Sequence, residues 1–146
     1  MDSSPSVVIP AGWSFERCLE TGVDLLLSDH LPDSSFRPRA TLTSAPSALS
    51  LRDLLRVRVE ELREALQDVD VEDAEIHDLG ITDACYVRVL HRLDSRDVIT
   101  EIWVWLLADT AWTLTATVDH RDYVDFCDTF ELLATSFQPG ASGTAA

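Results

Sequence analysis

Hydrophobic and polar residues alternate with the two-residue period of β-strands through much of the second half of the chain. From Val69 to Val118 this pattern is interrupted by turn-forming residues at 78–83, 94–97 and 108–110. The pattern predicts four consecutive antiparallel strands. Residues 102–107, IWVWLL, are apolar on both alternating faces, so we expect a central strand that is covered on both sides.

The last of these strands has two unlike faces. Its apolar side chains share one face: Trp112, Leu114, Ala116 and Val118. Thr113, Thr115 and Thr117 share the other face. We expect the threonine face to lie nearer solvent.

Two segments have the period of an α-helix instead. The first runs from Ser50 to Gln67 with a leucine face, and Ser50 followed by Asp53 forms a capping-box-like start. The second follows Asp119, which can cap it, and continues to about Ser136. We expect the two helices to supply the two covers of the sheet.

The N-terminal part predicts a hairpin and a further strand. Alternation after Trp13 and again over residues 23–27 indicates two strands that join around residues 20–22. Residues 28–38 are rich in turn formers and predict an exposed loop. Another strand is expected over 39–43.

These elements together predict a single α+β domain over residues 1–138. Its antiparallel sheet of about six to seven strands is flanked by a mid-chain helix and a C-terminal helix. The tail, 139–146, has no apolar periodicity and is expected to be disordered.

Composition adds a packed core and a strong negative charge to this picture. The 146 residues are 46% hydrophobic, as in one globular domain, and carry a formal charge of −15. That charge repels phosphate backbones and anionic bilayers, so neither nucleic acid nor a membrane is an expected partner. Acidity either serves solubility alone or matches a basic surface on another protein.

The residue types that carry catalysis or bind metals are scattered. The four histidines lack the spacing that places two metal ligands on one helix face, and no nucleophile elbow or glycine-rich phosphate loop occurs. His77, next to Asp78 and near Glu75, resembles an acid–base pair, but adjacent strand residues point to opposite faces. We expect no catalytic residues, no metal and no cofactor, unless folding brings a histidine against a carboxylate in a deep cleft.

Two features are candidate binding surfaces. Carboxylates recur every third residue near the C-terminus as a spiralling stripe: Asp119, Asp122, Asp125, Asp128 and Glu131. Trp103 and Trp105 project together from one face of the central strand. We therefore take Trp103, Trp105, Asp122, Asp125 and Asp128 as candidate partner-binding residues, with a solvated helix face and an ordinary core as the alternatives.

Three stretches carry a resemblance that spans most of the chain: VVIPAGWSF, PRATLTSAPSA and WTLTATVDHRDYVDFCDTFELLATSF. In this order they resemble the PsbP-like proteins, whose fold is shared by Mog-type nuclear import factors and the actinobacterial LpqN-like group. The resemblance implies an antiparallel sheet flanked by helices, and binding or escort roles rather than catalysis. LpqN-like proteins are often lipoproteins, but this N-terminus has neither a signal peptide nor a lipobox cysteine, so a cytoplasmic location is expected.

The sequence thus favours a non-catalytic module that binds another protein, as a chaperone or adaptor does. The partner is expected to present a basic surface, and a second copy of the chain is another candidate partner. The alternative is a carrier of a small apolar ligand, with a pocket between the sheet and the C-terminal helix.

Overall fold

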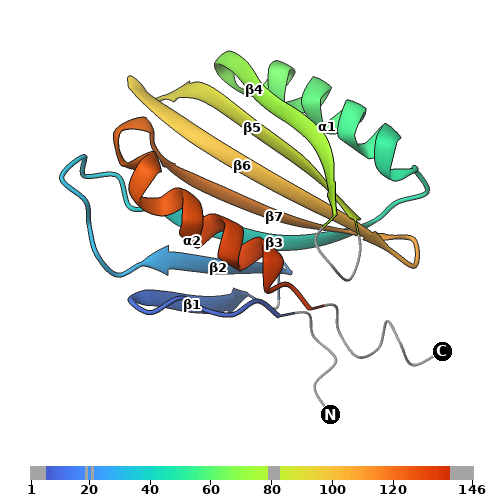
Figure 1. Ribbon diagram of the computed structural model, residues 1–146, viewed down its shortest axis with the longest axis horizontal. Helices are drawn as coiled ribbons and strands as arrows, with labels where there is room; N and C mark the ends of the chain where they lie inside the picture. The colour runs from blue at the N-terminus through green and yellow to red at the C-terminus, as the bar shows by residue number, and fades with distance from the viewer. Residues whose placement is uncertain (1–5, 19, 21, 79–82, 139–146) are drawn as a thin grey trace.

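In the computed structural model, which describes residues 6–18, 20, 22–78 and 83–138, one antiparallel sheet runs through the whole molecule (Figure 1). Its strands are β1 (Trp13–Cys18), β2 (Val23–Ser28), β3 (Arg39–Pro46), β4 (Gln67–Asp78), β5 (Asp83–Leu93), β6 (Arg96–Leu107) and β7 (Thr110–Asp119). They lie in the order β1-β2-β3-β7-β6-β5-β4. The predicted α+β class, the N-terminal hairpin and the four consecutive strands are confirmed.

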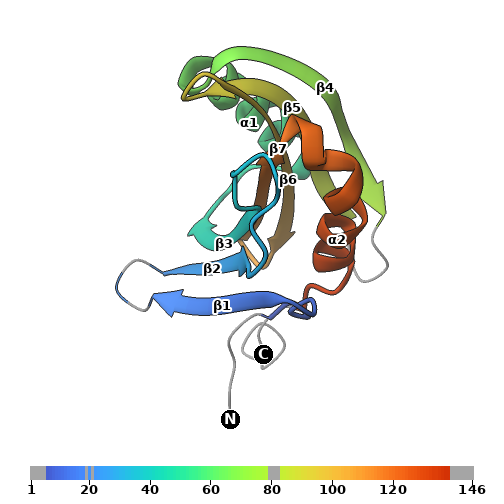
Figure 2. The same cartoon turned by 90° about the vertical axis from the view of Figure 1, so that its left-hand side faces the viewer.

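The two helices cover opposite faces of the sheet. Helix α1 (Leu51–Ala65) packs on β4, β5 and β6. After a short 3-10 turn, η1 (His120–Asp122), helix α2 (Tyr123–Thr135) crosses the other face. Figure 2 shows the sheet curving, with α2 on its inner side and α1 on its outer side. The predicted tail, 139–146, lies outside the described residues.

Strand alternation divides the core between these two faces. On the α2 side, Trp105 and Leu114 pack with Phe130 and Phe137. On the α1 side, Ile102 and Val104 pack with Leu54 and Cys85. Strand β6 therefore has buried side chains on both faces, which confirms the prediction of a central strand covered on both sides.

The helix starts follow the predicted caps, with one shift. The Ser50 hydroxyl accepts a hydrogen bond from the Asp53 backbone N–H at 3.2 Å and begins α1. Asp119 caps the 3-10 turn by accepting from the Arg121 N–H at 2.8 Å, so α2 itself begins only at Tyr123. No helix in the described ranges is long and apolar enough to cross a membrane.

The threonine face of β7 is drier than its sequence suggests. Thr113 and Thr115 are partly exposed, but Thr117 is buried. Its hydroxyl lies 3.2 Å from that of Thr100, which is 2.8 Å from Nε2 of His91. These hydrogen bonds connect three buried polar side chains, and they allow Thr117 to be buried where a position nearer solvent was expected.

Candidate functional site

A cleft of about 280 Å³ lies between the β4–β5–β6 part of the sheet and α2. It is lined by Asp73, His77, Tyr86, Arg88, Glu101, Trp103, Tyr123, Cys127, Asp128 and Glu131. Acidic and aromatic side chains dominate this set. The cleft is thus the place where the charge of the chain meets a concave, aromatic surface.

Strand register brings together the cleft residues that come from the sheet. Asp73 pairs with Arg88, and Arg88 pairs with Glu101, which makes one row across β4, β5 and β6. In the next row, Tyr86 pairs with Trp103. Side chains two residues apart on a strand share a face, so both rows point toward α2.

Helix periodicity brings together the residues that come from α2. Tyr123, Cys127 and Glu131 are spaced four residues apart and therefore share one face of the helix. Asp128 stands next to them, and the carboxylates of Asp128 and Glu131 are exposed at the rim. The helix contributes a phenol deep in the cleft and two carboxylates at its mouth.

The innermost charged group is the carboxyl of Glu101, a residue only 4% exposed. Its Oε2 accepts hydrogen bonds from the hydroxyls of Tyr86 and Tyr123, the latter at 3.2 Å. Its Oε1 is buried and has no hydrogen-bond partner in the described part of the chain. Burial raises the pKa of Glu101, and the hydrogen bonds from the two tyrosines and the nearby Arg88 only partly oppose that rise.

Aromatic rings form the walls around this carboxyl. The rings of Tyr86 and Trp103 lie 5.2 Å apart, and the His77 ring stacks on Tyr86 at 4.7 Å. The guanidinium of Arg88 lies 5.9 Å above the Tyr123 ring and donates from Nε to Glu72 at 3.1 Å. The face of Tyr123 is thus already occupied by a cation from the chain itself.

The formal charges of the cleft do not balance. Four lining side chains are carboxylic acids: Asp73, Glu101, Asp128 and Glu131. Among the described lining residues, Arg88 is the one permanent cation, and its guanidinium already forms an ion pair with Glu72. A concave, partly dry site with excess negative charge concentrates the field of its carboxylates and favours a cation.

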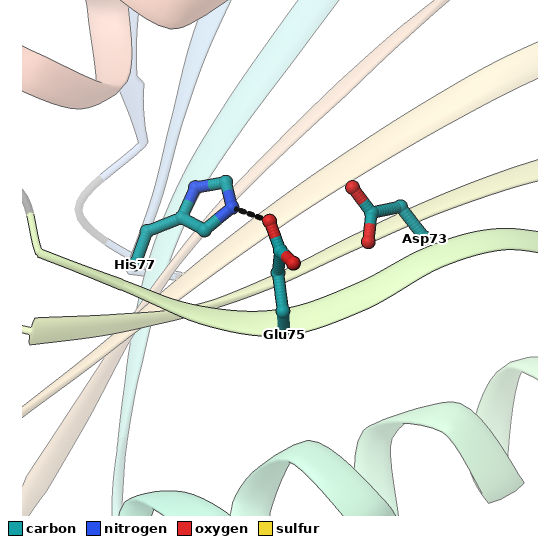
Figure 3. Close-up of side chains that lie close together, drawn as sticks. All are labelled: Asp73, Glu75 and His77. Carbon is teal, nitrogen blue, oxygen red and sulfur yellow. Dashed lines mark hydrogen bonds and ion pairs between the residues drawn. The ribbon is translucent and has the colours of Figure 1, made fainter.

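Three side chains stand side by side on β4, as Figure 3 shows, and two of them, Asp73 and His77, also line the cleft. One donor atom each from Asp73, Glu75 and His77 lies within 4.8 Å of the others, and His77 Nε2 is 2.5 Å from Glu75 Oε1. One nitrogen and two oxygens are donors that a divalent ion can take. The contact between His77 and Glu75 alone is enough to keep two of the three side chains close together without a metal ion. The expectation of no metal therefore stays a prediction.

The structure separates the candidate binding residues named from the sequence. Trp103 (3% exposed) and Asp128 line the cleft. Trp105 is 1% exposed and stacks on Phe137 at 4.3 Å, so it belongs to the core. The Asp122 carboxylate accepts a hydrogen bond from the Ser34 hydroxyl at 2.5 Å, and Asp125 is exposed but does not line the cleft. The partner-binding role of these residues stays a prediction.

The sequence patterns do not single out the residues that give the cleft its chemistry, namely Glu101, Tyr86, Arg88 and Tyr123. One signal for Glu101 was available. Glu101 stands two residues before Trp103, so the two side chains share one face of a strand that was expected to be covered on both sides. An acidic residue at such a position is rare in cores unless it is paired or used.

No family model matches the sequence, and no curated protein is similar to it in sequence. Solved structures do share its fold. LpqN of Mycobacterium tuberculosis, involved in cell envelope biogenesis, superposes with a TM-score of 0.71 at 14% identity, over 94% of this chain and 85% of LpqN. The Ran-binding protein Mog1p of Saccharomyces cerevisiae superposes with a TM-score of 0.68 at 12% sequence identity, over 93% of this chain and 90% of Mog1p.

The cyanobacterial PsbP protein of Synechocystis gives a TM-score of 0.62 at 11% identity, over 94% of this chain and 87% of that protein. Each comparison covers nearly the whole of both chains, so the likeness includes the sheet and both helices rather than one motif. At these identities it establishes the fold and not the residues of the cleft. The chain therefore has the PsbP/Mog-type fold, in the form that LpqN also adopts.

Proposed function

We propose that this chain is a non-catalytic protein-binding module, and that its acidic cleft receives a cationic segment of the partner. The observation that carries the proposal is the buried Glu101 carboxyl, whose Oε1 lacks a partner within the described residues. A buried polar atom left unbonded costs roughly 1–3 kcal/mol, so its presence calls for an explanation. A ligand cation in the cleft would supply the missing partner.

The remaining groups of the cleft support binding over catalysis. His77 does reach a carboxylate, but the His77 and Glu75 side chains are 33% and 55% exposed and stand at the rim rather than deep in the cleft. Cys85 lies on the α1 face, where burial raises the pKa of its thiol to about 11. Neither residue is placed as a general base or an activated nucleophile.

Proteins with this fold give the proposal a wider context. Mog1p is described as binding Ran, which is a protein partner, and LpqN takes part in cell envelope biogenesis. We infer a role of the chaperone or adaptor kind for this chain, with a partner that carries a basic surface. The cytoplasmic location and the possible pairing of two copies stay predictions.

A salt- and mutation-controlled capture experiment tests this proposal. Immobilised wild-type protein is compared with the double variant Asp128→Asn, Glu131→Gln in a lysate of the source cells, at about 50 mM and about 200 mM salt. The matched control is the double variant Glu60→Gln, Glu64→Gln, which also removes two exposed charges, but from α1 on the other face of the sheet (Figure 2). We expect a stoichiometric partner that wild type and control retain and the double variant loses.

A partner that the double variant retains in full would refute the cleft as the binding site. Retention that does not depend on salt would refute the electrostatic part of the proposal, because exposed carboxylates at the rim are screened by ions.

The alternative function, a carrier of a small apolar ligand, does not fit the polar lining of the cleft. A cavity does lie between the sheet and the C-terminal helix, where that hypothesis places it. It is lined, however, by four carboxylic acids and an arginine, which an apolar compound would desolvate without replacing their hydrogen bonds. The cleft therefore fits a charged ligand better than an apolar one.

A further inference from the structure

The cleft can distinguish between kinds of cation, because only one oxygen of its buried carboxyl is without a hydrogen-bond partner among the described residues. Oε2 of Glu101 already accepts from the hydroxyls of Tyr86 and Tyr123. Oε1 is buried and unpartnered, on a residue that lines the cleft. A ligand that reaches Glu101 therefore meets one oxygen and not a two-oxygen fork.

Guanidinium and ammonium groups use a carboxylate differently. Arginine gains most from a planar, bidentate contact with both oxygens, whereas the lysine ammonium is a compact point charge that one oxygen can bind. One ring face on which a guanidinium could stack is also taken, since Arg88 lies over Tyr123 at 5.9 Å. Both features favour an ammonium group over a second guanidinium.

The surroundings suit an ammonium group on a flexible apolar stem. The rings of Tyr86 and Trp103 stand beside Glu101, and aromatic faces attract cations while they also pack against methylene groups. Asp128 and Glu131 are exposed at the mouth, where they can steer a positive side chain inward. The stem would then lie against the rings with its charge at Glu101.

We propose that the cleft binds the ammonium group of a lysine side chain of the partner protein, with Glu101 Oε1 as its buried acceptor. This inference rests on the proposed function and names the residue type that the cleft selects. The other charged or titratable groups that line the cleft around Glu101 come from three elements: Tyr86 and Arg88 from β5, Asp73 and His77 from β4, and Tyr123, Cys127, Asp128 and Glu131 from α2.

Proton release on binding gives the inference a second signature. Burial raises the pKa of Glu101 in the free protein, and a bound ammonium would lower it again by favouring the carboxylate. Lysine binding should therefore release protons and strengthen as pH rises through the pKa of Glu101. Calorimetry in two buffers of different ionisation enthalpy measures that release directly.

The test uses five-residue peptides of the form acetyl-Gly-Gly-Xaa-Gly-Gly-amide, with lysine, arginine or norleucine at the centre. Dissociation constants come from two-dimensional NMR titration of the whole chain at low salt, followed at the indole N–H of Trp103. We expect the lysine peptide to bind roughly tenfold more tightly than either other peptide. The free amine n-butylamine should bind more weakly than the lysine peptide.

Three variants locate the effect. Glu101→Gln should bring the affinity for the lysine peptide down to that for the arginine peptide, and Glu64→Gln, which removes an exposed charge from α1, should leave it unchanged. Tyr123→Phe removes one hydroxyl from Oε2 and should narrow the preference for lysine over arginine, because a fork then becomes more accessible. This variant keeps the ring, so it tests the inference even if Glu101→Gln does not fold.

The possible results separate the inference from the proposed function. Equal or tighter binding of the arginine peptide overturns the lysine inference and leaves a basic partner in place. Failure of both cationic peptides, together with unchanged capture by the double rim variant, overturns both. Tighter binding of n-butylamine than of the lysine peptide overturns a protein as the source of the amine.

Discussion

Replacing Glu101 with glutamine should change how stability depends on pH, in a direction that the structure fixes. Burial raises the pKa of Glu101 in the folded protein above the ordinary glutamate value of 4.5. Between these two pKa values the folded chain keeps a proton that the unfolded chain has released. Wild-type stability therefore falls with rising pH in this window, by up to about 1.4 kcal/mol per pH unit from this one group.

Glu101→Gln has no proton to lose, so its stability relative to wild type should rise over the same window. Below pH 4.5 the difference should be flat, because both states of wild type then hold the proton. The glutamine amide places a donor group near the site of Oε1, which adds a cost of roughly 1–3 kcal/mol if it stays unbonded. That cost shifts the stability difference between variant and wild type by the same amount at every pH, so it does not change the slope of that difference with pH.

The assay is urea denaturation followed by tryptophan fluorescence, from about pH 4 to about pH 8, with both proteins in the same buffers. Carboxylates that do not interact with Glu101 cancel in the difference between variant and wild type. Asp125→Asn serves as the control for removing one exposed charge and should give no comparable slope. A difference between Glu101→Gln and wild type that is independent of pH would refute the argument that burial raises the pKa of this carboxyl.

Three further predictions concern the frame around the cleft. Phe137→Ala should cost about 3–5 kcal/mol in unfolding free energy, measured by urea denaturation, because the ring is buried and stacked on Trp105; a cost below about 1 kcal/mol would contradict this packing. Ser50→Ala should cost about 1 kcal/mol by loss of the N-cap bond, and Ser50→Gly less; equal values would argue against the cap. Burial raises the pKa of Asp119, but hydrogen bonds from Arg121 and Arg96 outweigh burial and lower it to about 2 from 3.8. Acidification from pH 4 to pH 2 should therefore remove roughly 2 kcal/mol of stability from wild type and not from Asp119→Asn, as unfolding at each pH will show.

The elements of this fold follow from local patterns. Residues 102–107 are apolar at every position, and only a strand covered on both sides satisfies that pattern. Ser50 supplies a cap whose hydrogen bond is made within one turn of helix. Each of these features depends on neighbours in sequence, and for that reason the strands, the helices and their order were predictable.

The acidic stripe shows where a local pattern is not enough. A step of three residues turns a helix by about 300°, so carboxylates at this spacing rotate steadily around the axis. Asp122 lies in the 3-10 turn before α2 and meets Ser34, whereas within the helix Asp125 faces solvent and Asp128 reaches the cleft. The sequence gives the charges and their spacing, but the docking of the helix decides which of them share a site.

The cleft itself depends on strand register. Asp73, Arg88 and Glu101 lie far apart in sequence and meet only because β4, β5 and β6 pair with these residues in one row. A shift by one residue in any of these pairings would turn one partner to the α1 face, so the three side chains would no longer line one cleft. Periodicity predicts that a strand exists without fixing its register, so the set could not be assembled from the sequence.

The core and the cleft also use different edges of α2. Its buried side chains, Phe130 and Leu133, belong to the core on the inner face, which includes β7 and β6. Its other edge presents Tyr123 and Glu131 toward the rows on β4 and β5. In this chain the apolar edge fixes the helix on the sheet, while the polar edge lines the cleft. What the cleft can bind therefore depends on the few side chains that line it, and not on the packing that builds the fold.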